Sequence, residues 1–403
     1  MRWQAAAVLC AVPLFVRAAE WTSEATLATR AEGIRNSALT VPASEPAYRF
    51  TLSGAANLAG RAENWDTDAS AGIAAYRSND SSLENTDYTA GIGASRRFTL
   101  DTFRLRANYR RDSTLASELQ TTGIVVERVQ RGNANVTLAW QHAFTERFSA
   151  SIEGGKAASH YFAPQGSGLV DNTARTLAVG ASYAYDERTS IGVTASELRF
   201  DTDPFTSRTR VQSAQVNVSR ALNERWSVSA AYGPARTHTE TASAALVCPA
   251  PVELCQAGLV PFVAVPTTAS QEANGSLYSV TAVYAATPTT GIVLQASRSA
   301  NPSGVGAVVV AERYAATMTS RLSEYWTLAL AATAIQSTTL VNSTESQTRW
   351  ADLSGTLTWQ AAERLYVDGG LRAESAVYAP GAHPYSATAF VALRYNPRLG
   401  VLR

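Results

Sequence analysis

The sequence predicts an all-β fold, a transmembrane antiparallel β-barrel of about 16 strands (16–18), with short periplasmic turns and long extracellular loops. Three observations predict this fold. Many segments alternate apolar and polar residues with a period of two, and the connections between them alternate between short and long. No uncharged apolar run of the roughly 20 residues that a membrane helix needs follows residue 19, although 46% of the 403 residues are hydrophobic.

The alternation separates two chemically different faces. Along residues 177–185, large apolar side chains at every second position alternate with small ones such as Gly180 and Ser182. A soluble sandwich would expose a face rich in Lys and Glu, whereas small polar residues suit the inside of a barrel. We therefore expect the first face to contact lipid. Its predicted members include Leu138, Val179, Val228, Leu328, Leu357 and Val391.

Aromatic residues stand near the ends of the predicted strands, on the apolar face. Short turns at residues 145–147, 186–188, 221–225 and 323–325 alternate with longer polar connections such as 116–132 and 237–272. Outer-membrane barrels carry aromatic girdles where their strands leave the bilayer. The predicted girdle consists of Trp140, Tyr185, Trp226, Trp326 and Trp359.

The chain divides into four predicted parts: a signal peptide at 1–19, a periplasmic extension at 20–46, the barrel at 47–396 and a tail at 397–403. A basic Arg2 followed by an apolar stretch and a small-residue cleavage site is typical of export signals. Residues 48–59 also alternate and would raise the strand count toward 18 if they found a partner. Residues 387–395 resemble the C-terminal strand that the barrel-assembly machinery recognises, which makes that machinery an expected partner beside outer-membrane lipid.

The two cysteines that remain after cleavage lie in a Pro-rich segment without strand pattern. Export places them in an oxidising compartment, where a disulfide is favoured over a metal site. We expect Cys248 and Cys255 to form a disulfide in the longest extracellular loop.

The sequence contains no pattern that predicts an enzyme, a metal site or a cofactor. Its four histidines lack metal-ligand spacing, and no nucleophile elbow or phosphate-binding glycine loop is present. The net charge of +1 gives no indication of nucleic-acid binding. A hydrolase with a Ser–His pair at the barrel rim stays the third alternative.

Arginines form a constellation on the predicted inner face. Arg104, Arg106, Asn108 and Arg110 share one side of their strand, opposite Phe103 and its apolar neighbours. An arginine facing lipid near the midplane costs about 2–4 kcal/mol, so these residues should face the lumen. By the same reasoning the lumen should also contain Glu153, Arg313, Asp352, Asp368, Arg372 and Arg394. Two interpretations stay open: ion pairs that stiffen the wall, or a basic stripe that favours anions.

Residues 70–80 and 87–96 resemble the start of the outer-membrane β-barrel proteins encoded with exopolysaccharide and PEP-CTERM loci in proteobacteria. The turns at 145–148, 223–226 and 362–365, each with a Glu-Arg pair, are similar to that group as well. The resemblance would cover residues 47–396. It implies a barrel and a role in the envelope or in polysaccharide export, with export components as partners, and it provides no catalytic residue.

Together these features predict an outer-membrane protein that is a passive conduit or envelope component. The alternative is a structural or adhesion barrel with a filled lumen and functional loops. Because the inner face carries small residues, we expect a water-filled lumen that residues 238–272 partly constrict.

Overall fold

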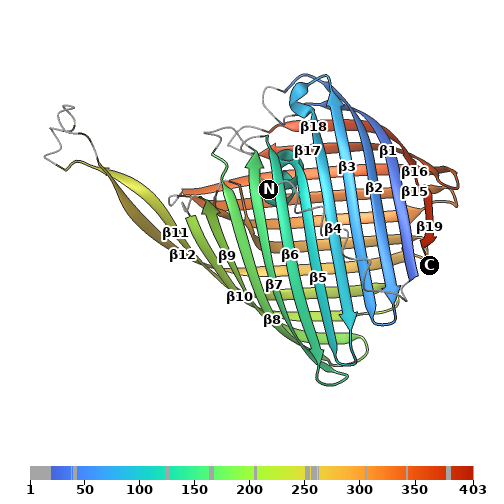
Figure 1. Ribbon diagram of the computed structural model, residues 1–403, viewed down its shortest axis with the longest axis horizontal. Coiled ribbons are helices and arrows are strands. Elements are labelled where there is room, and N and C mark those ends of the chain that lie inside the picture. The colour runs from blue at the N-terminus through green and yellow to red at the C-terminus, as the bar shows by residue number, and fades with distance from the viewer. Residues whose placement is uncertain are drawn as a thin grey trace.

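The computed structural model describes residues 20–37, 39, 43–122, 128–162, 168–203, 207–249, 255, 261, 263–304, 306–341, 344–377 and 383–402. The predicted signal peptide, 1–19, lies outside them. Within the described residues, no helix is long and apolar enough to cross a membrane. Nearly all of the described chain is strand (Figure 1).

The elements run in the order β1 (Glu20–Arg35), β2 (Ala47–Ala62), β3 (Trp65–Ser78), η2 (Ser81–Leu83), β4 (Asn85–Arg97), β5 (Asp101–Ser113), α2 (Thr114–Thr122), β6 (Gln130–Ala143), β7 (Phe148–Phe162), β8 (Asp171–Ala184), β9 (Thr189–Asp203), β10 (Ser207–Ala221), β11 (Trp226–Val247), β12 (Val263–Thr287), β13 (Thr290–Pro302), β14 (Val308–Arg321), β15 (Trp326–Val341), β16 (Thr344–Ala362), β17 (Leu365–Val377), β18 (Tyr385–Tyr395) and β19 (Arg398–Leu402).

The strands close into one antiparallel barrel. Each strand from β1 to β17 pairs with the next, and β18 pairs back to β1, from Leu27 opposite Tyr395 to Arg35 opposite Ala387. The ring therefore has 18 strands, and β19 continues beyond β18 along the start of β1. The all-β transmembrane barrel is confirmed, with 18 strands instead of about 16.

One of the two additional strands, β2, is the alternating segment at 48–59, and the other, β1, was misassigned in the sequence interpretation. Residues 20–35 form β1, which pairs with β2 on one side and β18 on the other, so they are not a periplasmic extension. The tail also differs, since Arg398–Leu402 forms β19. On the outward side of β1, the large residues Trp21, Leu27 and Arg35 are separated by small ones such as Ala25, Ala31 and Gly33. Such a strand gives little period-two signal.

Short turns join the strands at the end of the barrel where β1 begins and β18 ends (Figure 1). Side-chain oxygens stabilise them: Thr145 Oγ1 accepts hydrogen bonds from the backbone N–H groups of residues 147 and 148, and Asn223 Oδ1 from those of 225 and 226. Ser323 Oγ does the same for residues 325 and 326. These local turns explain why the recurrent motifs could be recognised in the sequence.

The predicted girdle residues all lie at this short-turn end. Trp226 and Trp326 begin their strands, and Trp359 lies near the end of β16. The ring of Trp326 stacks on that of Trp359 with 6.0 Å between centroids, and Trp226 stacks on Tyr284 at 4.3 Å. They are placed to form the periplasmic interface of the barrel.

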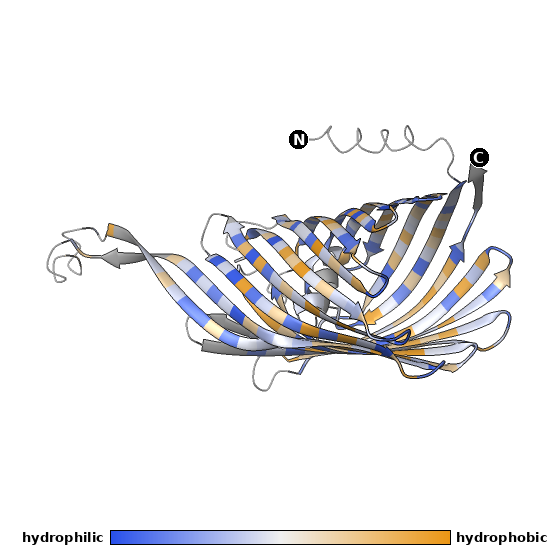
Figure 2. Ribbon diagram, turned by 90° about the horizontal axis from the view of Figure 1, so that it is seen from below, coloured by the Kyte–Doolittle hydropathy of each residue, from blue (hydrophilic) through white to orange (hydrophobic). Residues whose placement is uncertain are grey.

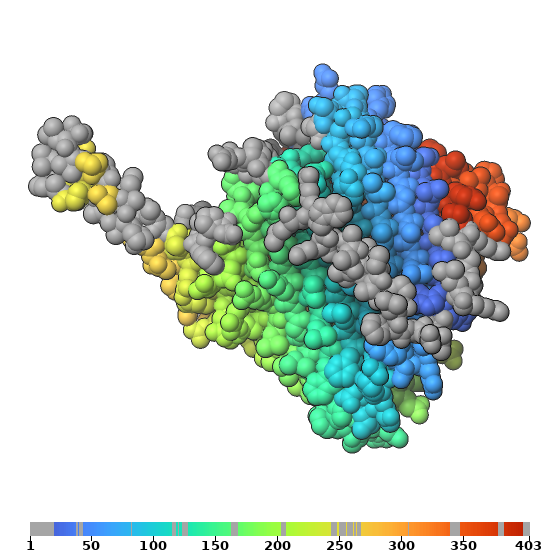
Figure 3. All heavy atoms as spheres, in the orientation of Figure 1, coloured from blue at the N-terminus to red at the C-terminus, as the bar shows by residue number. Residues whose placement is uncertain are grey.

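At the opposite end, β11 and β12 extend far beyond their neighbours as a two-stranded ribbon (Figure 1). β11 and β12 pair with each other as far as Val247 opposite Val263. By contrast, β10 pairs with β11 only as far as Thr241, and β13 pairs with β12 only from Tyr278 onward. The expectation that 237–272 is a loop is thus wrong, because its Ala, Ser and Thr residues form strands without a clear alternation. The ribbon projects away from the barrel, so it does not constrict the lumen (Figures 1 and 3).

A disulfide joins Cys248 and Cys255 at the tip of the ribbon, with 6.0 Å between their Cα atoms. We predict that replacing both cysteines by Ser leaves the unfolding temperature of the barrel unchanged. The bond orders only the tip, by about 2 kcal/mol, whereas the closed strand ladder holds the barrel. Heat-modifiable mobility of the refolded protein in electrophoresis measures this, and a fall of several degrees would contradict it.

Candidate functional site: the lumen and its constriction

The two faces of the barrel wall have different surroundings: the outer face is apolar and the inner face is lined by polar residues. Leu138 and Val391, which share the outward side of their strands with the aromatic residues, are 57% and 61% exposed. Figure 2 shows the resulting alternation of apolar and polar bands along each strand. A closed ring with an apolar exterior satisfies its backbone hydrogen bonds internally and can be surrounded by lipid. The chain is therefore an outer-membrane β-barrel.

Small polar side chains line the inner face of β5 to β11, as expected from the alternation. A cavity of about 450 Å³ lies against this face, and Gly180, Ser182, Thr194, Arg104 and Glu153 are among its lining residues. Such side chains leave space inside the barrel.

A helix occupies part of this space. α2 follows β5 directly, yet it contacts β14 and β15. In a ring of 18 strands, β14 lies opposite β5, so α2 crosses the lumen from one wall to the other. The constriction is therefore made by α2, and not by residues 238–272.

One side of α2 packs on the wall formed by β14 to β17. Leu119 is buried in a cluster with Ile335, Trp350 and other apolar residues of these strands, and Trp350 is only 3% exposed. Ser337, which is completely buried, donates a hydrogen bond from its hydroxyl to the backbone carbonyl of Thr122. Apolar packing and a buried hydrogen bond thus hold the helix against this wall.

The other side of α2 is held by charged and polar groups of β6 and β7. The Glu118 carboxylate accepts a hydrogen bond from the Tyr161 hydroxyl and lies 3.5 Å from a guanidinium nitrogen of Arg131. Glu118 is 4% exposed, and burial raises the pKa of its carboxyl above the ordinary value. Docking of α2 is therefore coupled to protonation of Glu118.

The predicted lumenal residues fall into two groups. On β16 to β18, Arg372 Nε lies 2.5 Å from Asp352, and an Arg394 nitrogen lies 3.2 Å from Asp368. These four residues form ion pairs along the inner wall. Their charges offset one another, as the interpretation of a stiffened wall requires.

In the second group of predicted lumenal residues, fewer side chains form ion pairs. Arg110 forms an ion pair with Asp112 at 2.5 Å, and the Asn108 amide donates a hydrogen bond to Asn135. Within the described part of the chain, the other predicted residues have no ion-pair partner and are exposed on the inner side; they are Arg104, Arg106, Glu153 and Arg313. Three free cations and one free anion leave this part of the lumen positive.

A charged chamber that the sequence interpretation missed lies beside α2. It has a volume of about 160 Å³ and is lined in part by Arg30, Arg49, Arg128, Glu32 and Glu374. Glu32 pairs with both Arg30, at 2.8 Å, and Arg49. The chamber was missed because β1 was not recognised as a strand. A signal for the α2 contact was present, because Ile335 and Trp350 are large apolar residues at inward positions of strands whose inner side otherwise carries small or polar residues.

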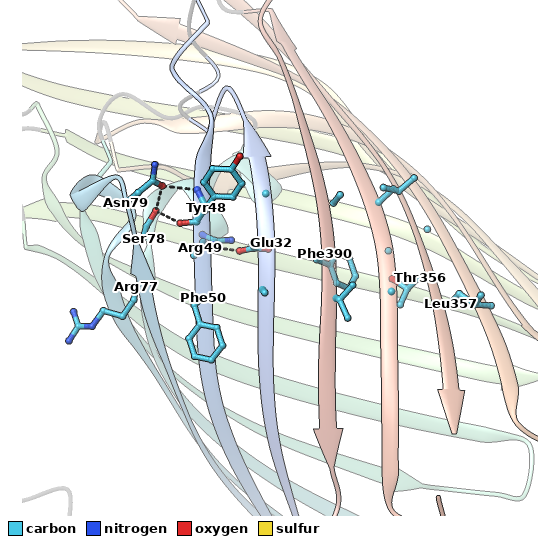
Figure 4. Close-up of a pocket in the computed structure, with 18 of the residues that line it drawn as sticks. Glu32, Tyr48, Arg49, Phe50, Arg77, Ser78, Asn79, Thr356, Leu357 and Phe390 are labelled. Carbon is cyan, nitrogen blue, oxygen red and sulfur yellow. Dashed lines mark hydrogen bonds and ion pairs between the residues drawn. The ribbon is translucent and has the colours of Figure 1, made fainter. Parts of the chain in front are cut away.

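A separate groove of about 1100 Å³ lies on the outer surface, across β15 to β18 and β1 to β3 (Figure 4). Its lining includes Gly33, Phe50, Leu357 and Leu371, which are all on the outward side of their strands. Arg49, by contrast, turns inward to Glu32. The groove therefore faces the membrane and is not part of the lumen.

The histidines do not gather into a site. His142 and His160 pair with Asp101 and Asp171, and His238 lies 3.4 Å from Glu240, all on the outward side of the wall. Among the residues that the structure describes, no group of three or more His, Cys, Asp or Glu could hold a metal ion. These placements give the hydrolase alternative no support.

Comparisons with known proteins bear on the fold only. No family model and no curated protein matches the chain. Among solved structures it is similar to a BenF-like porin from Pseudomonas fluorescens Pf-5, with 10% identity, a TM-score of 0.49, and 94% of this chain and 99% of that one covered. The chain is also similar to OpdQ of Pseudomonas aeruginosa, with 9% identity, a TM-score of 0.46, and 94% of this chain and 99% of that one covered. It is similar as well to the ferric-catecholate import receptor Fiu of E. coli K12, with 9% identity, a TM-score of 0.46, and 95% of this chain and 82% of that one covered.

Proposed function

We propose that this protein is a passive outer-membrane channel for small solutes, which α2 narrows and which free lumenal arginines bias toward anions. The observation that carries the proposal is the helix that crosses an otherwise small-residue lumen. Barrels of 16–18 strands leave an aqueous channel unless something fills it. α2 fills one level of the lumen and leaves the cavity along β5 to β11 below it.

The preference for anions rests on Arg104 and Arg106. Both lie on the inner side of β5, are exposed, and have no ion-pair partner in the described part of the chain. Arg110 contributes less, because Asp112 neutralises it. Rings or rows of arginine favour anions in pores.

The test is the reversal potential of single channels in asymmetric KCl. We expect the parent to prefer chloride, and Arg104→Ser with Arg106→Ser to shift the reversal potential toward the potassium value. The matched control is Arg394→Ser with Asp368→Ser, because it removes both charges of an existing lumenal ion pair and leaves the net lumenal charge unchanged, so the reversal potential should stay near that of the parent. A cation-selective parent, or equal shifts in the two variants, would remove the arginine row from selectivity.

The buried cluster around Leu119 favours a second candidate function, a scaffold barrel whose lumen is closed. In that case the parent conducts no ions. A role in polysaccharide export stays an expectation from the resemblance, and it would require α2 to leave the lumen, because a polymer chain is much wider than a hydrated ion. Conductance of the parent separates the channel from the scaffold.

A further inference from the structure

A row of basic residues crosses the outside of the barrel. Lys156 of β7 lies directly opposite Arg175 of β8, which lies opposite Arg199 of β9, which in turn lies opposite Arg210 of β10. His238 of β11 continues the row beside Arg210. All four cationic residues are exposed.

This row faces away from the lumen. Arg175 shares its side of β8 with Leu177 and Val179, which are 50% and 51% exposed and lie next along the strand. The row also lies toward the end of the barrel that carries the ribbon. Arg210 pairs with His238, shortly before β11 loses its pairing with β10 at Thr241 and continues into the ribbon. It thus stands at the border where the apolar belt meets the outer leaflet headgroups. The surface of β7 to β10 that carries it is the green face beside the base of the ribbon in Figure 3.

Like charges directly opposite one another destabilise a sheet unless something compensates them. The protein compensates only part of the row: Glu197 lies 2.5 Å from both Arg199 and Arg210. Neither Lys156 nor Arg175 has an ion-pair partner among the described residues. The unfavourable arrangement therefore indicates an external anion.

The row borders a hollow that could hold such an anion. The hollow has a volume of about 490 Å³ and is lined by Arg175, Arg199, Arg208 and Arg210, with Asp201, Glu240 and His238 at its side. Asp201 is already engaged by Arg208 at 2.9 Å. Guanidinium groups bind the oxygens of phosphate in a bidentate manner, which makes phosphate a better match than a spherical chloride ion.

We propose that this basic row binds the phosphate groups of the phosphorylated glycolipid of the outer leaflet, with its acyl chains lying against the apolar residues of β8 and β9. Charge complementarity and position select this occupant: the row is at headgroup level and opens toward lipid. The proposal is independent of the channel, because none of these side chains faces the lumen.

The test uses the refolded full chain in detergent and native mass spectrometry with bisphosphorylated lipid A. We expect the parent to retain lipid A and to retain its dephosphorylated form much more weakly. At about fivefold per arginine, Arg175→Gln, Arg199→Gln and Arg210→Gln together should weaken binding on the order of a hundredfold. The single Arg175→Gln variant should weaken it about fivefold, and it breaks no ion pair of the fold.

The matched control is Arg35→Gln with Arg77→Gln, which removes two outward arginines from the other side of the barrel at the same end. It should bind lipid A as the parent does. All variants must show the heat-modifiable band of the folded barrel, and the single variant decides the question if the triple one does not fold. Equal retention of the two lipid forms, unchanged binding by Arg175→Gln, or inorganic phosphate that binds as tightly as lipid A would overturn the proposal.

Discussion

Replacing residues 115–127 by a short Gly-Ser linker is expected to raise the single-channel conductance several-fold. α2 crosses the lumen between opposite walls, so its removal widens the part of the 18-strand ring that is open to water and ions. The measurement is unitary conductance in a planar bilayer.

A milder variant, Trp350→Ala, should weaken docking of α2 by about 3 kcal/mol and give frequent transitions to the larger conductance.

The matched control removes residues 244–266, the outer part of the ribbon. This deletion should leave the conductance of the parent unchanged, because the ribbon projects away from the barrel. If the ribbon deletion opened the channel and the α2 replacement did not, the constriction would have been assigned to the wrong segment.

Acidification is expected to lower the conductance of the parent, and Glu118→Gln is expected to abolish this dependence. Docking buries Glu118 and raises the pKa of its carboxyl above the ordinary value of 4.5. Glu118 of the docked helix therefore binds its carboxyl proton more tightly than Glu118 of an undocked helix. Docking consequently gains stability as pH falls toward 4.5. That gain is lost as pH rises through the raised pKa.

The measurement is conductance as a function of pH from neutral to about 4.5, the reference value of a free glutamate. Glu118→Gln is neutral at every pH and should show the low conductance throughout. Glu146→Gln, in the short turn at the far end of the barrel, is the control and should follow the parent. A parent conductance that rises on acidification would contradict the coupling.

The wall of the barrel could be predicted because its pattern is local. Along residues 177–185, alternation alone separates Leu177 and Val179 from Gly180 and Ser182, and the structure places these two sets on opposite faces. The turn motifs around Thr145 and Asn223 are equally local, since each side chain bonds to backbone two and three residues ahead.

The constriction could not be predicted in the same way. α2 has the sequence Thr-Leu-Ala-Ser-Glu-Leu-Gln-Thr-Thr, which is short and largely polar, so it carries little helical signal of its own. It is held by residues such as Tyr161, Ser337 and Trp350, which are far away in the sequence. Only closure of the ring brings them together. That closure depends on β1, whose outward side carries mostly small residues and gives little period-two signal.

The narrowest passage of the channel can be sized directly with polyethylene glycols of graded length added to both sides of a planar bilayer. Polymers that enter the channel lower its conductance, and those that are too large do not. We predict that the parent conducts ions and excludes all but the smallest polymers, whereas the α2 replacement admits larger ones. A parent that admits the same polymers as the α2 replacement, or two proteins that both conduct no ions, would contradict a channel narrowed by α2.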